Sequence, residues 1–226
     1  MQFHPQFLAA ARACLPALPG VIVFAAISGV AMVAAGMPHY LAMTMSVLVY
    51  AGQAQLAALQ LVSSGSPLAI AIAAGLVINL RFSIYSLSMA PFLSGAPARR
   101  KAALAYLLSD NGYALAIQSF ERLPDPADKV WYYLGGAAAI WVAWQAGTLA
   151  GIFLGTRIPA GWQLEFSIVL TFLAMVIPTI RDRAVAIAAL AAGVTAVIAW
   201  PLPLRSGLIV AVAAGIVAGM LAEKWK

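Results

Sequence analysis

The segment Leu76–Ser88, LVINLRFSIYSLS, decides how the rest of the chain is interpreted. It places Asn79 and Arg81 inside a run from Pro67 to Ala90 that is otherwise apolar and long enough to cross a bilayer. An arginine at the centre of a membrane helix costs about 2.5–3.5 kcal/mol on insertion scales, so it needs a partner. Asp110 is the one acid that falls deep inside a predicted span, since Glu165 lies at the start of another. We therefore expect Arg81 and Asp110 to approach each other near the middle of the membrane.

The composition is that of an integral membrane protein. Of the 226 residues, 64% are hydrophobic and 9% are charged, whereas a soluble domain has roughly 25% charged residues. The net charge of +6 comes from basic residues near the ends of apolar segments, where anionic headgroups favour them, and it does not indicate a nucleic-acid partner. The single cysteine excludes an internal disulfide. No histidines or acids have metal-ligand spacing, so we expect no metal and no cofactor.

Apolar segments separated by short loops predict an all-α, polytopic membrane protein with seven or eight transmembrane helices. The loops leave no room for a second domain, so we expect one transporter domain over residues 1–226. Each span needs about 20 apolar residues. The predicted spans are Ala17–Gly36, Leu41–Val62, Pro67–Ala90, Ala103–Phe120, Trp131–Leu154, Leu164–Ile180, Ala184–Trp200 and Arg205–Ala222.

The distribution of basic residues leaves the membrane orientation open. Eight full spans put the densest cluster, Arg99–Lys101, on the opposite side of the membrane from Arg122 and Lys129. Basic residues favour the cytoplasmic side, so the two groups give conflicting answers. A cytoplasmic Arg99–Lys101 requires either an external N-terminus or a different number of spans.

The second and third predicted spans carry polar side chains on two opposite faces. At 100° per residue, Gln55 points away from Gln53 in the second span, and Asn79 points away from Arg81 in the third. One interpretation is a straight helix surrounded by protein. The other is a helix broken near Gly52 or Asn79, a device by which transporters expose backbone groups to a substrate.

The fourth predicted span carries Tyr106, Asp110 and Tyr113 on one face. A continuous helix would place the carboxylate of Asp110 between two phenols. Because a carboxylate at this depth can exchange a proton with a bound substrate, we predict that Asp110 couples transport to an ion.

Small residues predict a close helix contact and an internal repeat. Glycines every four residues let two membrane helices approach closely, and the fifth span holds such a ladder at Gly147, Gly151 and Gly155. The segments Ser46–Gly52 and Ser167–Leu173 are weakly similar, which is compatible with a repeat or with alanine-rich composition alone.

The polar side chains within the spans suit recognition of a small zwitterion. A guanidinium binds a carboxylate, an aspartate with amide oxygens binds an ammonium, and apolar walls accept a side chain. The chain has no nucleophile–base motif and no glycine-rich phosphate loop, so we expect no enzyme activity. A purely structural Arg–Asp pair is the alternative. The predicted substrate-binding residues are Tyr50, Gln53, Gln55, Asn79, Arg81, Tyr85 and Asp110.

Several of these segments together resemble the AzlC family, the large subunit of two-component branched-chain amino acid exporters. They are YAGQAQLAALQ at Tyr50–Gln60, NLRFSIYS at Asn79–Ser86, the pair Arg99–Arg100, LSDNGYA at Leu108–Ala114 and, more weakly, LEF at Leu164–Phe166. The resemblance covers most of the chain and is strongest from Tyr50 to Ala114.

The resemblance implies export of valine, leucine, isoleucine or methionine across the bacterial inner membrane, together with a small AzlD-like membrane subunit. It assigns family motif positions to Gln55, Asn79, Arg81, Tyr85 and Asp110. The family usually has an Asp-Glu pair where this chain has Asp110 and Asn111, which puts the ion coupling or substrate range in question. The alternatives are a scaffold subunit that stabilises a partner and a channel for a small solute.

Overall fold

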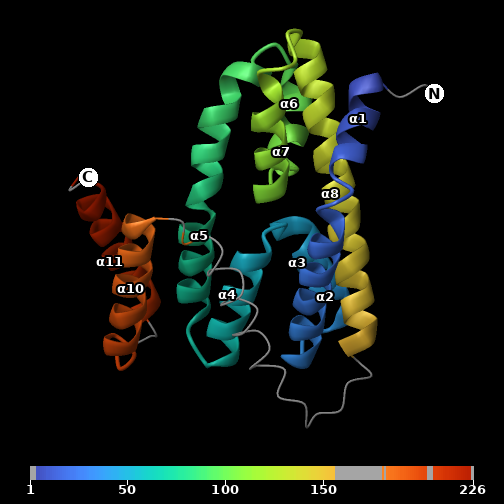
Figure 1. Cartoon of the computed structure of the whole chain (residues 1–226). Helices are drawn as coiled ribbons and strands as arrows, with labels where there is room; N and C mark the ends of the chain where they lie inside the picture. The colour runs from blue at the N-terminus through green and yellow to red at the C-terminus, as the bar shows by residue number, and fades with distance from the viewer. Residues whose placement is uncertain (1–3, 156–179, 181, 203–205, 225–226) are drawn as a thin grey trace. The chain divides into compact units, whose positions relative to one another are not determined.

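The structure, a computed structural model, describes residues 4–155, 180, 182–202 and 206–224. These residues form ten α-helices and one 3-10 helix and contain no strand, which confirms the all-α prediction (Figure 1). The predicted span Leu164–Ile180 and its LEF motif lie outside the described residues. The helices are α1 (Pro5–Ala13), α2 (Leu18–Ala34), α3 (His39–Val49), α4 (Gly52–Ser63), α5 (Leu68–Met89), η1 (Ala90–Leu93), α6 (Ala98–Tyr106), α7 (Asp110–Phe120), α8 (Pro126–Gly155), α10 (Arg183–Ile198) and α11 (Gly207–Glu223).

The chain divides into two compact units. Unit 1 comprises Met1–Gln55 and Asn79–Ile158, and unit 2 comprises Leu56–Ile78 and Pro159–Lys226. The candidate site lies wholly within unit 1.

In unit 1, α8 is a 30-residue axis along which α1 and α2 run in the same direction (Figure 1). His4 lies 3.7 Å from Asp128 near the start of α8, and Gly151 near its end packs against Ala26 of α2. A bend of 70° separates α1 from α2.

The predicted glycine ladder is a close contact between α8 and α2. A Cβ atom on Gly151 would overlap the backbone of Ala26, and one on Gly147 would lie 2.6 Å from the carbonyl oxygen of Ile22. The contact is milder at Gly155, where the nearest atom is the Cα of Val30 at 3.2 Å. The small residues therefore allow the two backbones to touch.

The second predicted span is a helical hairpin, which we call hairpin 1. The chain reverses between α3 and α4 at Tyr50, whose backbone is left-handed (φ 39°, ψ 42°). Gln55 Nε2 donates to the carbonyl oxygen of Met45 at 3.1 Å, although residues ten positions apart are about 15 Å apart in a continuous helix. The break lies next to Gly52, at one of the two places expected.

The fourth predicted span is also a hairpin, hairpin 2, so the prediction of one continuous helix is wrong. Along α8, α6 runs parallel, because Arg100 lies over Trp131 and Leu104 accepts from Tyr133. The helix α7 runs antiparallel, because Ser119, near its C-terminal end, bonds to Tyr132 near the start of α8. Tyr106 consequently lies on a different helix from Asp110 and Tyr113.

Ordinary capping chemistry explains where hairpin 2 reverses. Ser109 is the N-cap of α7, and its side chain accepts from the backbone N–H of Gly112 at 3.2 Å. Asp110 occupies the first turn, where the positive end of the helix dipole favours an acid. A serine followed by an acid starts a new helix more readily than it continues an old one.

The two hairpins enter unit 1 from opposite ends, and their tips meet near the middle of α8. The ring of Tyr50, at the tip of hairpin 1, lies 6.3 Å from the ring of Trp144. Trp141 Nε1 donates to the hydroxyl of Tyr106, at the tip of hairpin 2, at 2.9 Å. The ring centroids of Tyr50 and Tyr106 are 6.1 Å apart. In contrast, α5 continues through Asn79 without the second break that we considered.

Only some of the helices are long and apolar enough to cross a membrane. Among the described residues, these are Leu68–Leu93, which joins α5 and η1, and Pro126–Gly155, with α1 and α2 as a third if the bent pair counts as one span. Two of the predicted spans are hairpins instead of single long helices, and α10 and α11 are shorter apolar helices of 16 and 17 residues.

The re-entrant course of hairpin 2 also corrects the predicted distribution of charge. Arg100 contacts Trp131, so Arg99–Lys101 lies at the same end of unit 1 as Lys129. Eight full spans would put these two groups on opposite sides; the shared end agrees with the alternative of a different number of spans.

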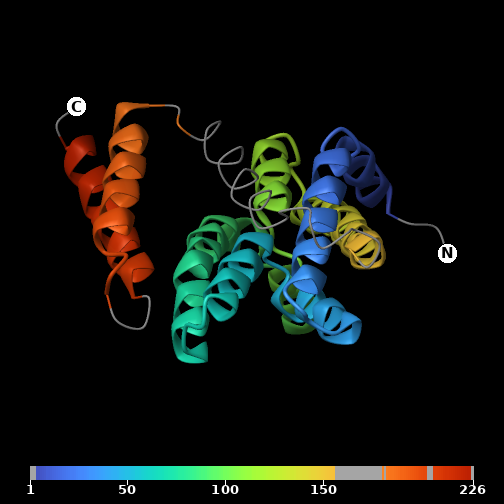
Figure 2. The ribbon, with the colours of Figure 1, turned by 90° about the horizontal axis from the view of Figure 1, so that it is seen from below.

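In unit 2, α10 and α11 lie side by side (Figure 2). A Cβ atom on Gly215 would lie 3.0 Å from Cβ of Ala192, and one on Gly219 would lie 3.1 Å from Cβ of Ala188. Small residues again allow close packing of two apolar helices.

Candidate functional site

The central feature of the site is Arg81, which joins the tips of both hairpins. Its Nη1 donates to Oε1 of Gln53 in hairpin 1, and its Nη2 lies 3.1 Å from Oδ2 of Asp110 in hairpin 2. The Arg81 side chain is 24% exposed and that of Asp110 is 46% exposed. The predicted approach of the two charges is confirmed, and the guanidinium fork holds three elements together.

A ladder of hydroxyl groups extends from Asp110 along α5 and α7. Tyr85 donates to Oδ1 of Asp110 at 3.1 Å, and its ring stacks on that of Tyr113 with 4.3 Å between centroids. Tyr113 in turn bonds to the hydroxyl of Ser88 at 3.1 Å. Asp110 thus accepts from Arg81 and Tyr85, which are on neighbouring turns of α5.

The reversals leave backbone groups available at the tips. Both α4 and α7 begin there, so the first N–H groups of two helices lie in the middle of unit 1. The carbonyl oxygen of Val47, near the end of α3, accepts from the hydroxyl of Tyr106 at 2.7 Å. Such groups are typical of midplane sites in transporters with discontinuous helices.

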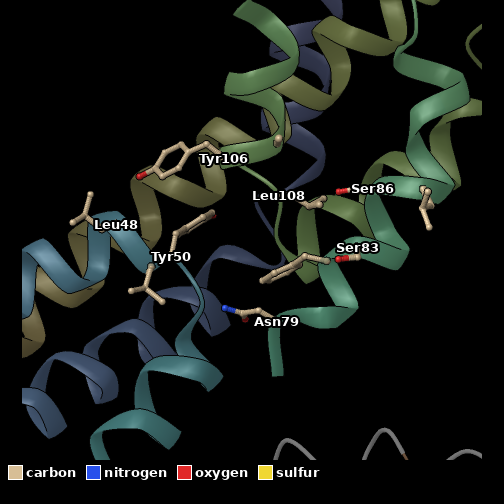
Figure 3. Close-up of a pocket in the computed structure, with 11 residues that line it drawn as sticks. Leu48, Tyr50, Asn79, Ser83, Ser86, Tyr106 and Leu108 are labelled. Atoms are coloured by element: carbon tan, nitrogen blue, oxygen red, sulfur yellow. The ribbon is translucent and has the colours of Figure 1, made fainter. Parts of the chain in front are cut away.

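A pocket of about 630 Å³ lies between the two tips and α5 (Figure 3). Its polar groups include Asn79, Ser83 and Ser86 of α5, and its apolar walls include Leu48 and Leu108. The oxygen Oδ1 of Asn79 is buried and has no hydrogen-bond partner among the described residues. A buried acceptor without a partner is costly, so this atom is suited to receive a donor from a ligand.

The structure divides the predicted binding residues into three groups. Tyr50 and Asn79 line the pocket. The members of the polar cluster around the guanidinium are Gln53, Arg81, Tyr85 and Asp110. Gln55 is only 1% exposed, and its amide nitrogen is bonded to α3. Of the three amides predicted to bind substrate, only Asn79 therefore lines the pocket, whereas Gln53 bonds to Arg81 and Gln55 packs against α3.

A buried network that the sequence analysis missed supports hairpin 1. The hydroxyl of Ser46 lies 3.0 Å from Oε1 of Gln145 and 3.1 Å from the hydroxyl of Thr148, and it accepts from Nε1 of Trp144 at 3.0 Å. These contacts fix α3 to α8 just before the reversal. Two polar residues in an apolar stretch of α8, Gln145 and Thr148, were the available signal.

The comparison with known families matches residues 16–158 to the model described as AzlC protein. This chain belongs to the AzlC family. The matched range runs from just before α2 to the end of α8, so both hairpins and Arg81 lie within it. AzlC proteins are transporters rather than enzymes.

A relative from Archaeoglobus fulgidus, named as an uncharacterized membrane protein, is 31% identical over 188 residues. The alignment covers 81% of this chain and 78% of the relative. No solved structure gives a significant match. The AzlC protein described here is thus a membrane protein. No solved relative supplies the arrangement of its helices.

Proposed function

We propose that this AzlC protein is a secondary transporter subunit that exports small hydrophobic amino acids, such as valine, leucine, isoleucine or methionine. The observation that carries the proposal is the position of Arg81, which bridges the tips of two opposed hairpins beside a pocket with apolar walls. A zwitterion with an apolar side chain needs both kinds of surroundings.

In the proposed complex, the apolar side chain lies in the pocket against Leu48 and Leu108. The free oxygen of Asn79 accepts from the ammonium group. The carboxylate engages Arg81 when the guanidinium releases Gln53 or Asp110, since both of its nitrogens that face the tips are already bonded.

Asp110 is the proposed coupling residue. A carboxylate that loses Arg81 to the substrate becomes free to take up a proton or to bind the ammonium. The linkage must be reciprocal, because substrate and proton then share one partner. The neighbouring residue is Asn111, which is exposed and cannot carry a second proton.

We further propose an AzlD-like membrane subunit as partner and the bacterial inner membrane as location. Membership of the AzlC family supports both proposals. A subunit of this kind would complete an exporter of two components within the lipid bilayer.

The same contacts also favour one alternative, a scaffold subunit in which the Arg81–Asp110 pair is only structural. Both terminal nitrogens of the guanidinium have partners without any substrate, and only Nε has none among the described residues; each charge of such a pair needs the other whatever the function.

Efflux of labelled amino acids from cells with and without the chain and its partner tests the proposal. We expect faster efflux of the branched-chain substrates, against a gradient. Efflux only down a gradient would instead indicate a channel. A well-assembled Asp110→Asn variant with unchanged efflux would favour the scaffold.

A further inference from the structure

A second, smaller pocket opens beside the first and points to an entry subsite for the substrate carboxylate. It has a volume of about 200 Å³ and lies between α5, α6 and α8. Ser86, Ala105 and Leu108 line both pockets, so these three residues form the boundary between them.

Lys101 is the one charged residue that lines the second pocket. Its ammonium makes no ion pair with any acid in the part of the chain that the structure describes. The other polar group with a large side chain, the hydroxyl of Tyr133, is already used as a donor to the carbonyl oxygen of Leu104. An anion in this pocket would therefore meet an uncompensated positive charge and no negative one.

The charge distribution of unit 1 identifies which side this pocket faces. Lys101 lies at the end that also holds Arg99, Arg100 and Lys129. The opposite end, at the α2–α3 loop and the end of α8, has no lysine or arginine among the described residues of unit 1, and the sequence has one arginine, Arg157, shortly after α8. Lysine and arginine mark the cytoplasmic side of membrane proteins, so the second pocket opens toward the cytoplasm, from which an exporter takes its substrate.

We propose that the second pocket is a cytoplasmic entry subsite in which Lys101 binds the carboxylate of the amino acid before it passes Leu108 into the central pocket. This inference rests on the proposed function. The apolar residues Met89, Leu93 and Leu104 accept the side chain. Lysine suits this role because it acts as a flexible point charge and releases an anion more easily than a bidentate arginine does.

The experiment measures labelling of a cysteine at the boundary, Ser86→Cys, in inside-out vesicles. The parent chain gives the background, because its single cysteine, Cys14, is buried. An anionic and a cationic methanethiosulfonate of similar size are compared. One unit charge about 6 Å away in water-like surroundings changes the local concentration of a monovalent ion about threefold. We expect the anionic reagent to label Ser86→Cys at least about threefold faster than it labels Ser86→Cys combined with Lys101→Gln.

Arg99→Gln is the matched control, because it removes the same charge two residues away on α6 from a side chain that does not line the pocket. It should keep the preference for the anionic reagent. If both variants lose the preference for the anionic reagent equally, or if Ser86→Cys itself shows no such preference, the proposed subsite is wrong. Ala105→Cys is a second probe if Ser86→Cys assembles poorly, since Ala105 lines both pockets.

Leucine efflux separates this inference from the function on which it rests. Lys101→Gln should raise the internal leucine concentration for half-maximal efflux about threefold and leave the maximal rate unchanged. An unchanged concentration dependence would also overturn the subsite. If the unmodified chain exports no leucine, the proposed function fails, whereas the labelling result still shows whether Lys101 makes this pocket select anions.

Discussion

The tip of hairpin 1 can be displaced by one methyl group at Gly52. A Cβ atom there would overlap the outer ring atom Cη2 of Trp144 and would lie 2.8 Å from Cε1 of Phe24. Trp144 cannot easily move away, because its Nε1 is bonded to the buried hydroxyl of Ser46. Gly52→Ala should therefore move the backbone of the tip rather than the ring.

The size of the effect follows from these distances. Ordinary contact between carbon atoms is about 3.5 Å, so the tip has to move by roughly 0.7 Å to relieve the contact with Phe24 alone. Overpacking of this kind costs about 1–3 kcal/mol of stability. A displacement near 1 Å at a binding constellation can reduce a rate about 100-fold. We expect a 10- to 100-fold loss of efflux, because Gln53 follows Gly52 directly and holds Arg81.

The assay is leucine efflux together with the melting temperature in detergent. Gly75→Ala is the control, since a Cβ atom at Gly75 meets nothing within 4 Å. It should leave efflux unchanged and gain slightly in stability from helix propensity. Replacing Trp144 by phenylalanine in the Gly52→Ala background removes the overlapping ring and should restore part of the efflux. Normal efflux in Gly52→Ala, or no recovery in the double variant, would refute the reasoning.

Three further predictions concern the two residues of the central ion pair and the contact between α2 and α8. Asp110→Asn cannot take up a proton, so it should flatten the pH dependence of substrate affinity; a wild-type pH profile in a monodisperse sample would exclude Asp110 as the coupling residue. Arg81→Lys removes the planar fork that joins the two tips, so efflux should fall at least about tenfold while the membrane yield stays normal. Retained efflux would mean that a bond from residue 81 to a single tip is enough for transport. Gly151→Leu should separate α8 from α2 and lower the yield, whereas Gly155→Ala should lower it much less, because its nearest contact, the Cα of Val30 at 3.2 Å, requires a shift of only a few tenths of an ångström. Equal yields for the two would contradict the assigned packing.

Charge and capping rules explain which parts of the site could be predicted from the sequence. The approach of Arg81 and Asp110 followed from the cost of an isolated charge at membrane depth, and it holds in the structure at 3.1 Å. The break beside Gly52 was one of two alternatives suggested by amides on opposite faces of one segment. Both inferences rest on local chemistry, which does not depend on the path of the chain.

The course of hairpin 2 was not predicted, because apolar length was given more weight than capping. Ala103–Phe120 is apolar enough to resemble a span, and the N-cap signal at Ser109 with Asp110 was present in the sequence. The consequence was the apparent conflict between Arg99–Lys101 and the other basic residues, which left the orientation open. Gln55 was misplaced for another reason: it does point away from Gln53 within α4, but the reversal at Tyr50 puts α3, and not the pocket, on that side.

Arg81 links the tips of two hairpins that enter from opposite ends. Each tip contributes to both the central pocket and the polar cluster: hairpin 1 through Tyr50 and Gln53, among others, and hairpin 2 through Leu108 and Asp110. A ligand that alters one of the two bonds to Arg81 therefore acts on a tip that also forms the pocket wall. In the proposed transport cycle, release of one tip would open the pocket toward one side only while the other tip stays bonded, because the hairpins enter from opposite ends. Alternating access in this arrangement requires only that substrate and Asp110 compete for one guanidinium.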